Sequence, residues 1–230
     1  MPSSSSASTD TGTHATGEQT AGEQPAGERS YAGRSLADRK IERRGRFREA
    51  GLELFGTLGF SQVTVSAICT EAGLSRRQFY EEYTGRESLL AEIYDSIQLQ
   101  TRDAVIAAVT SSVTDAEFDI ATVARAAVTA YIDTITTDPR NIRCSFIEVG
   151  GVSDEVEHHR LAGRETWAGF IADTISSVPG TTARKIDYEA TAYIGALTSV
   201  VHRWGTSDPR PDRSEVVDLL TGMLVHLALD

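Results

Sequence analysis

The sequence predicts an all-α protein of about nine helices, with three helices near the N-terminus followed by a larger helical region. Two observations carry this prediction. From about residue 38 onward, apolar side chains recur at the three- and four-residue spacing of one helix face. Residues that start and end helices separate these stretches, and no segment alternates polar and apolar residues over the length of a strand.

Residues 1–33 are predicted to be a disordered tail, because they consist mostly of Ser, Thr, Gly, Ala, Glu and Gln and hold no large aliphatic side chain. Such a segment buries too little surface to offset the entropy of ordering it. The first helix begins near residue 38. It places Phe47, Leu54 and Phe55 on one face, and Gly59 is the residue expected to end it.

Local capping signals predict two short helices, over residues 65–72 and 76–82. Thr64 is the expected N-cap of the first, and Gly73 ends it because glycine tolerates positive φ. Ser75 and Gln78 form a capping box at the start of the second. The boundaries of both helices therefore follow from side chains close to them in sequence.

A further capping box, Thr84-Gly85-Arg86-Glu87, opens a long helix with Leu90, Ile93 and Ile97 on one face. Five later helices are predicted with looser bounds, over residues 116–137, 140–148, 154–178, 183–204 and 213–229. Proline follows the end of two of them, which is typical of a chain that leaves a helix.

Charge is distributed unevenly along the chain. The net charge is −11, yet residues 34–90 carry 10 basic and 8 acidic side chains, whereas residues 91–230 carry a net charge of −10. Seven cations lie within 15 positions: Arg34, Arg39, Lys40, Arg43, Arg44, Arg46 and Arg48. A local basic patch of this kind is typical of a nucleic-acid interface, although a solvated helix face has the same composition.

The two short helices, joined by Glu71-Ala72-Gly73-Leu74-Ser75, form a helix-turn-helix pattern. The second helix presents side chains that read base edges, since arginine pairs with guanine and glutamine with adenine. Its N-terminus and Thr64 favour phosphate. An ordinary helical hairpin with a capped second helix remains the alternative. The candidate DNA-reading residues are Arg76, Arg77, Gln78 and Tyr80.

Other classes of function find little support. The two cysteines, Cys69 and Cys144, exclude a disulfide framework and a cysteine-rich zinc site, and they fit a reducing cytoplasm. The N-terminus lacks a secretory signal, and no apolar run reaches the ~18 residues of a membrane span. Glu155 and His158 have the E-x-x-H spacing of di-iron bundles, but the second copy that such a site needs is missing. We therefore expect no enzyme, no metal, no cofactor and no membrane partner.

The stretch from Phe47 to Leu90, FREAGLELFGTLGFSQVTVSAICTEAGLSRRQFYEEYTGRESLL, resembles the DNA-binding head of the tetracycline-repressor (TetR) family of transcriptional regulators. Matching positions include Gly59-Phe60, Thr64-Val65, Ala72-Gly73-Leu74-Ser75 and Phe79-Tyr80. The resemblance implies an all-helical homodimer. It implies a helix-turn-helix DNA-binding domain over residues 34–86 and a ligand-binding and dimerisation domain over residues 87–230.

Carried over by position, the resemblance implies that Thr64, Tyr80 and Arg86 contact phosphates and that the start of the second short helix faces the major groove. Glu82 stands where the family often has histidine or another neutral residue. A carboxylate there would repel phosphate or accept a hydrogen bond from cytosine N4, so no contact from Glu82 to the DNA backbone is expected. The predicted DNA-binding set is Arg43, Arg44, Thr64, Ser75, Arg76, Arg77, Gln78, Tyr80 and Arg86. A short basic arm that enters the minor groove is a further hypothesis; it consists of Arg29, Arg34, Arg39 and Lys40.

Apolar stripes on the last two helices predict the dimer interface, because helices that are apolar on more than one side need both their own core and a second subunit. The predicted interface residues are Tyr193, Leu197, Val201, Trp204, Leu220, Met223, Leu224 and Leu227. In the family the ligand pocket lies among the middle helices. The candidates here are Arg102, Phe118, Tyr131, Arg143, Phe146, Trp167, Phe170 and Tyr193. A core position for the aromatic residues and a surface pair between Arg143 and Glu148 are the alternatives.

These observations together predict a ligand-responsive repressor. A homodimer would bind a palindromic operator in double-stranded DNA, and a small-molecule effector would shift it to a form that fits the operator poorly. The alternative is a helical protein-interaction module without specific DNA binding. The effector and the operator sequence stay open.

Overall fold

The computed structural model describes residues 35–113, 119–176 and 187–229, and all regular structure in these ranges is helical. The elements are α1 (Leu36–Thr57), a 3-10 turn η1 (Phe60–Gln62), α2 (Val65–Ala72), α3 (Arg76–Tyr80), α4 (Arg86–Ser112), α5 (Ile120–Thr136), α6 (Pro139–Arg143), a π-helical turn η2 (Cys144–Glu148), α7 (Asp154–Ser176), α8 (Asp187–Gly205) and α9 (Arg213–Leu229). For these residues, the prediction of an all-α protein of about nine helices is confirmed. The predicted disordered tail, residues 1–33, lies outside them.

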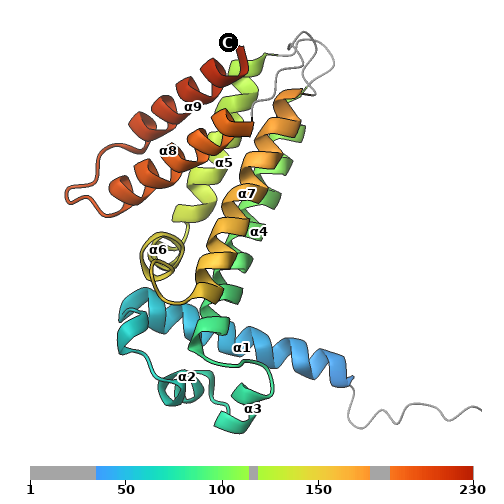
Figure 1. Cartoon of the computed structure of the whole chain (residues 1–230), viewed down its shortest axis with the longest axis vertical. Coiled ribbons are helices and arrows are strands. Elements are labelled where there is room, and N and C mark those ends of the chain that lie inside the picture. Colours follow the sequence, from blue (N-terminus) through green and yellow to red (C-terminus); the bar gives the residue numbers. More distant parts are fainter. Residues whose placement is uncertain (1–34, 114–118, 177–186, 230) are drawn as a thin grey trace, which may run out of the picture.

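Helices α1, α2 and α3 form a head at one end of the molecule, and the other α-helices form an elongated body (Figure 1). Helix α4 leaves the head and runs along the body, where it packs against α5 and α7. Helix α8 packs against α7 and α9, and α9 also packs against α5. The short α6 and η2 contact α1, so the body touches the head through these elements as well as through α4.

Hydrogen bonds between near neighbours fix the starts of the two short head helices. Thr64 Oγ1 accepts the backbone N–H of the third residue after it at 3.1 Å and starts α2, which Gly73 ends at a φ of 61°. Ser75 Oγ accepts the N–H of Gln78 at 3.2 Å, and Gln78 Oε1 accepts the N–H of Ser75 at 2.9 Å. Both predicted caps are confirmed. Helix α2 has its predicted bounds, whereas α3 ends two residues early, at Tyr80.

One predicted N-cap is wrong, and one predicted helix divides into two helical elements. Helix α4 has Gly85 and not Thr84 as its N-cap, because Ser88 Oγ accepts the N–H of Gly85 at 3.2 Å and donates to its carbonyl at 2.9 Å. Ser88 is thus the capping-box partner of the N-cap residue, the role that the sequence suggested for Glu87. The predicted single helix over 140–148 divides into α6 and the π-helical η2. A π-turn holds an extra residue, which rotates the side chains that follow it.

The later helices follow their predicted ranges wherever the chain is described. Helix α9 has the predicted bounds, and α5, α7 and α8 lie inside theirs except that α8 extends to Gly205. The predicted helical positions 116–118, 177–178 and 183–186 lie outside the described residues.

An aromatic cluster holds the head together. The ring of Phe47 on α1 contacts Phe79 and Tyr83 edge-on, at centroid distances of 5.3 and 6.0 Å. The rings of Phe79 and Tyr83 lie 5.4 Å apart, and all three side chains are buried. Leu89 and Leu90 of α4 are fully buried in the same core. The first turns of α4 therefore belong to the head, although the rest of the helix belongs to the body.

A polar network joins the end of α1 to η2. Arg143 donates to the carbonyl of Thr57 at 2.6 Å and to Glu148 Oε1 at 2.8 Å. Glu148 Oε2 accepts the backbone N–H of Phe60 at 2.7 Å. Gly59 passes between these groups with a φ of 92°, and a Cβ atom there would lie 2.7 Å from the guanidinium of Arg143. This junction requires glycine for both its conformation and its small size.

Replacing Gly59 with Ala is expected to destabilise the protein by about 1–3 kcal/mol, because an L-residue is strained at this φ and its methyl group crowds Arg143. Gly169→Ala is the matched control. Gly169 lies within α7, and apart from its chain neighbours and its own helix backbone nothing lies within 4 Å of its Cβ position, so alanine should stabilise the helix by about 0.5–1 kcal/mol. Urea denaturation measures both changes. A Gly59→Ala variant as stable as the parent would contradict the conformation assigned to this junction.

Candidate nucleic-acid interface and adjoining cavities

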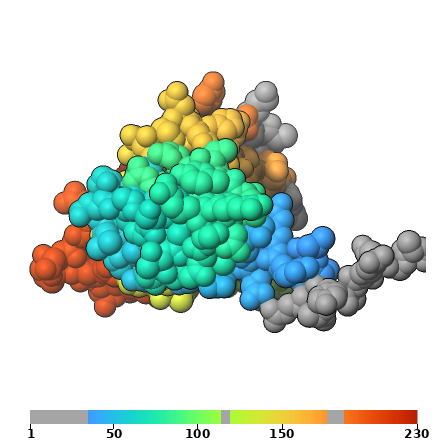
Figure 2. Space-filling view, turned by 90° about the horizontal axis from the view of Figure 1, so that it is seen from below, coloured from blue at the N-terminus to red at the C-terminus, as the bar shows by residue number. Residues whose placement is uncertain are grey.

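The helix-turn-helix lies at the free end of the head, where α3 is exposed. Figure 2 views the molecule from this end, and the cyan and green surface of the head fills its centre. Arg76 and Arg77 in the first turn of α3 are exposed, and Tyr80 at its end is 53% exposed. Arg77 Nε lies 3.2 Å from Glu81 Oε1, but its side chain is 89% exposed. An ion pair in water is weak, so these side chains remain available to a partner.

Ser75 and Gln78, both predicted to bind DNA, are engaged in the cap of α3. Gln78 Oε1 accepts from the N–H and from the hydroxyl of Ser75, at 2.9 Å each. Gln78 therefore offers a partner only its NH2 group. Thr64 is exposed at the start of α2. Its oxygen accepts the capping bond, and its hydroxyl proton stays free to donate.

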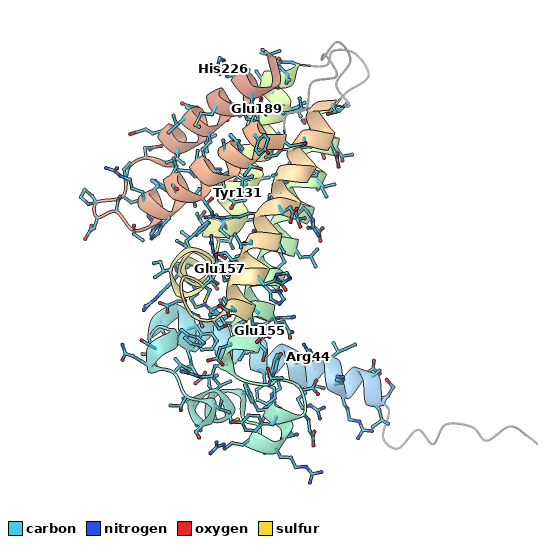
Figure 3. All side chains as sticks on the ribbon, in the orientation of Figure 1. Arg44, Tyr131, Glu155, Glu157, Glu189 and His226 are labelled. Atoms are coloured by element: carbon cyan, nitrogen blue, oxygen red, sulfur yellow. The ribbon has the colours of Figure 1, made fainter. Side chains whose placement is uncertain are left out.

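The arginines of α1 that were predicted to bind DNA turn toward the protein. Arg43 Nε donates to Glu82 Oε1 at 2.9 Å, and its terminal nitrogen bonds the same oxygen. Arg44 donates to the carbonyl of Glu82 at 3.3 Å and also pairs with Glu92. Its guanidinium lies 4.9 Å from the centre of the Tyr83 ring, where α1 passes the foot of the body (Figure 3). Part of the basic run is thus engaged inside the protein.

The carboxylate of Glu82 is the centre of this network, a role that the sequence did not predict. Its side chain is 1% exposed, and Lys40 lies 4.0 Å from it. Burial opposes ionisation, but the hydrogen bonds and charges of Arg43, Arg44 and Lys40 hold the pKa of Glu82 below its usual value. The available signal was a single carboxylate, placed where the resemblance implies a neutral residue, in a head whose first helix carries a run of cations.

Two further arginines connect elements within the head. Arg46 donates to the carbonyl of Ala72 at 2.6 Å, at the end of α2. Arg86, predicted to contact phosphate, donates to the carbonyls of Phe60, at 3.1 Å, and Val63. Its guanidinium also lies 4.6 Å from the centre of the Phe60 ring. Arg86 thereby joins the start of α4 to η1.

The hypothesis of a flexible basic arm does not fit the described part of that segment. Arg39 and Lys40 lie in the first turns of α1, which a capping box at Ser35 starts. They are therefore held in a helix. Arg29 and Arg34 lie outside the described residues.

The body contains an apolar cavity of about 440 Å³, lined by side chains of α4, α5, α7, α8 and α9. Four predicted pocket residues line it: Tyr131, which Figure 3 labels, and Trp167, Phe170 and Tyr193. Most of the other lining side chains are aliphatic, Val105 and Val109 of α4 among them. Burial raises the pKa of both tyrosines, so their hydroxyls are neutral. The volume lies in the range of small-molecule sites, which is about 300–1,000 Å³.

The other predicted pocket residues lie elsewhere. Phe146 lines a second, more polar cavity beside the first. Arg143 is held by Glu148, which is the surface pair considered as its alternative. Arg102 belongs to neither of these two linings. Phe118 lies outside the described residues.

The predicted dimer-interface residues mostly face the core of their own chain. Five are 6% exposed or less: Tyr193, Leu197, Val201, Trp204 and Leu220. Leu224 and Leu227 are half-buried against the same core, and Met223 is 37% exposed. The apolar stripes of α8 and α9 therefore pack within the subunit, because the widest apolar face of a helix is the one that its own core buries.

Neither a membrane span nor a metal-ligand group is found in the described ranges. No helix there combines the length and apolar character that crossing a membrane requires. No three His, Cys, Asp or Glu side chains are grouped as metal ligands there. Next to the E-x-x-H pair, His159 Nδ1 lies 2.7 Å from Asp95 Oδ2.

Replacing Glu82 with Gln is expected to lower the free energy of unfolding by about 3 kcal/mol near neutral pH, because Arg43 and Arg44 lose a buried carboxylate. The pKa of Glu82 lies below the ordinary value of 4.5. Its contribution is therefore complete above that value and is lost as the pH falls through the lower pKa of the folded state. Urea denaturation between about pH 7 and pH 3 should show this loss in the parent and not in the variant.

Glu81→Gln is the matched control. Glu81 is 43% exposed, and it contacts Arg43 at 3.7 Å and Arg77 at 3.2 Å. Exposed pairs of this kind contribute less than about 1 kcal/mol. Equal losses of stability from the two variants would contradict the central position of Glu82.

A family match identifies the head. Residues 47–93 match the family model for bacterial regulatory proteins of the tetR family. A search of curated protein sequences found no match.

Solved structures share the fold at low sequence identity. The fatty acid degradation regulator FadR from Bacillus halodurans is 14% identical, with a TM-score of 0.64 over 79% of this chain and 94% of that one. A TetR-like transcriptional regulator from Rhodococcus sp. RHA1 is 18% identical, with a TM-score of 0.60 over 82% and 97%. The multidrug binding protein EbrR, solved with imidazole, is 15% identical, with a TM-score of 0.60 over 79% and 94%. Residues 47–93 thus match the tetR family of bacterial regulatory proteins, and the fold of the described residues is similar to that of a solved TetR-like transcriptional regulator.

Proposed function

We propose that the chain is a ligand-responsive transcriptional repressor, which binds a two-fold-symmetric DNA operator as a homodimer and leaves it when a small molecule occupies the body. The observation that supports this proposal most directly is the solvent-exposed surface of α3. Arg76, Arg77 and Tyr80 face solvent there, while Arg43, Arg44, Arg46 and Arg86 are engaged inside the head. The proposal places the protein in the bacterial cytoplasm, where the DNA lies.

In the proposed complex α3 enters the major groove. Arg76 and Arg77 donate to the N7 and O6 acceptors of guanine, which arginine contacts with two parallel hydrogen bonds. Tyr80 and the free hydroxyl proton of Thr64 donate to phosphate oxygens on either side. The acidic remainder of the chain keeps the body away from DNA, since residues 91–230 carry a net charge of −10.

The proposed dimer uses the outer face of α8 and α9, which lie together at one side of the body (Figure 1). The exposed residues of these two helices include Leu219 and Met223 of α9, at 51% and 37%, and the small residues Ala192 of α8 and Gly222 of α9. Small residues allow close approach of helices from two subunits. A two-fold dimer presents its two α3 helices to half-sites about 34 Å apart or a multiple of that distance.

In this proposal residues 34–86 bind DNA and residues 87–230 bind the effector, which follows the domains predicted from the sequence. The apolar cavity lies in the second, and FadR and EbrR show that this fold occurs in a regulator of fatty acid degradation and in a multidrug binding protein. Helix α4 and η2 connect the cavity region to the head. An effector that binds more tightly to one of two head arrangements shifts the protein toward that arrangement. The affinity for DNA then changes by a coupling free energy of about 1–3 kcal/mol.

Selection of random duplex DNA by the purified full-length protein tests DNA recognition. Sequencing of the bound pool at moderate salt should show an enriched two-fold-symmetric motif that contains guanine in each half. Arg76→Ala and Arg77→Ala should each weaken binding to that motif roughly tenfold or more, because each removes contacts worth about 1–3 kcal/mol.

Arg125→Ala is the matched control, since it removes the same charge from an exposed position on α5. It should leave the affinity for the motif unchanged. If it weakens binding as much as the α3 variants, general electrostatic attraction and not α3 carries the binding. A pool without any enriched motif would favour the helical protein-interaction module instead.

A further inference from the structure

A polar cavity of about 270 Å³ lies directly beside the apolar one. Tyr131, Trp167, Ile194 and Leu197 line both, so the two spaces meet along one wall of four side chains. Trp167 is held in this wall by a hydrogen bond from Nε1 to Gln98 Oε1 at 2.9 Å. These four side chains therefore face an apolar space on one side and a polar space on the other.

Ser145 lines the polar cavity and has a buried hydroxyl without a hydrogen-bond partner. The residue belongs to η2 and is 4% exposed. Hydroxyls in the α-helices of this chain commonly donate to the carbonyl four residues earlier, as Thr101 and Thr136 do. Ser145 in the π-helical turn makes no such bond, so its donor is left for a group inside the cavity.

The charges that line the polar cavity leave one positive charge uncompensated. Arg160 and Glu157 neutralise each other, with Arg160 Nε 2.7 Å from Glu157 Oε2. Arg164 also lines the cavity; its charge acts on Glu157 too, but no carboxylate of the described residues lies within ion-pair distance of it. Its charge acts on the nearby hydroxyls of Tyr94 and Tyr131. A ligand with one negative charge matches this lining.

We propose that the effector is an amphipathic monocarboxylate, whose apolar body fills the apolar cavity and whose carboxylate binds Arg164 and Ser145 in the polar cavity. This inference rests on the proposed function, because it names the class of molecule that the regulator senses. The planar guanidinium of Arg164 donates two parallel bonds to a carboxylate, and the Ser145 hydroxyl donates a third. A neutral ligand would leave the guanidinium of Arg164 without a counter-charge.

The proposed contact with Ser145 also connects the ligand to the head. Ser145 and Glu148 belong to one five-residue turn, and Glu148 accepts the backbone N–H of Phe60 in the head at 2.7 Å. A carboxylate drawn to Ser145 therefore acts on the turn that holds the end of α1. Occupation of the polar cavity is expected to alter head orientation more than occupation of the apolar cavity alone.

Calorimetry on the full-length protein with three ten-carbon probes tests the charge assignment. The probes are decanoate and decyltrimethylammonium, each below its micellar concentration, and decanol below its solubility limit. Decanoate should bind at least about tenfold more tightly than decanol, because hydrogen bonds to a charged group are worth about 1.5 kcal/mol or more. The cation should bind most weakly. Equal affinity for decanoate and decanol would overturn the inference.

Two variants locate the carboxylate. Arg164→Gln should reduce decanoate affinity to about the level of decanol and leave decanol affinity unchanged, and Ser145→Ala should cause a smaller loss for decanoate only. Arg102→Gln is the matched control on α4, because Arg102 lies outside both linings; it should change neither affinity. Decanoate affinity that survives Arg164→Gln would overturn the inference.

DNA affinity measured with and without each probe separates this inference from the proposed function. If decanoate and decanol bind equally and either weakens DNA binding, the charge assignment fails and the proposed function stands. If decanoate binds through Arg164 but leaves DNA affinity unchanged, the proposed release mechanism fails and the ligand class stands. Binding of neither probe would overturn the inference, whatever the DNA selection shows.

Discussion

The buried carboxylate of Glu82 determines how α1 lies against the helix-turn-helix. It receives Arg43 and Arg44 from α1, across 39 and 38 positions of sequence. A carboxylate removed from water is stable only when its partners compensate for the lost hydration, so these arginines are bound to it firmly. The contact therefore fixes α3 relative to α1. It also divides the cations of the head into those that hold the fold and those that face solvent.

Helix α4 connects the head to the body as one unbroken helix. Leu89 and Leu90 lie in the core of the head, and Val105 and Val109 line the apolar cavity. Its 27 residues span about 40 Å at the rise of an α-helix. The η2 turn is a second connection, parallel to the first. Two connections between the same two parts restrict the rotations available to the head.

The sequence predicts best what neighbouring residues determine. The caps at Thr64 and Ser75 involve residues three positions apart, and the structure contains both as predicted. The partner of Arg43 is far away in sequence, and composition alone does not distinguish a cation that faces DNA from one that faces Glu82. The apolar stripe through Leu197 and Val201 likewise reveals burial without revealing whether the cover is the same subunit or another. The polar cavity depends on how four helices pack together, so no pattern of neighbouring residues in the sequence predicts it.

The engagement of Gln78 in its own cap limits the information that one head can read. Of the five residues of α3, Phe79 lies in the core and Gln78 keeps only its NH2 group for a partner, which leaves Arg76, Arg77 and Tyr80 with their side chains available in full. Arginine in the major groove selects guanine above all, so each head distinguishes few base pairs. In the proposed dimer, the distance between the two heads then supplies much of the remaining discrimination. Insertion of a few base pairs between two intact half-sites would turn a good operator into a poor one, so spacing itself becomes part of the recognition code.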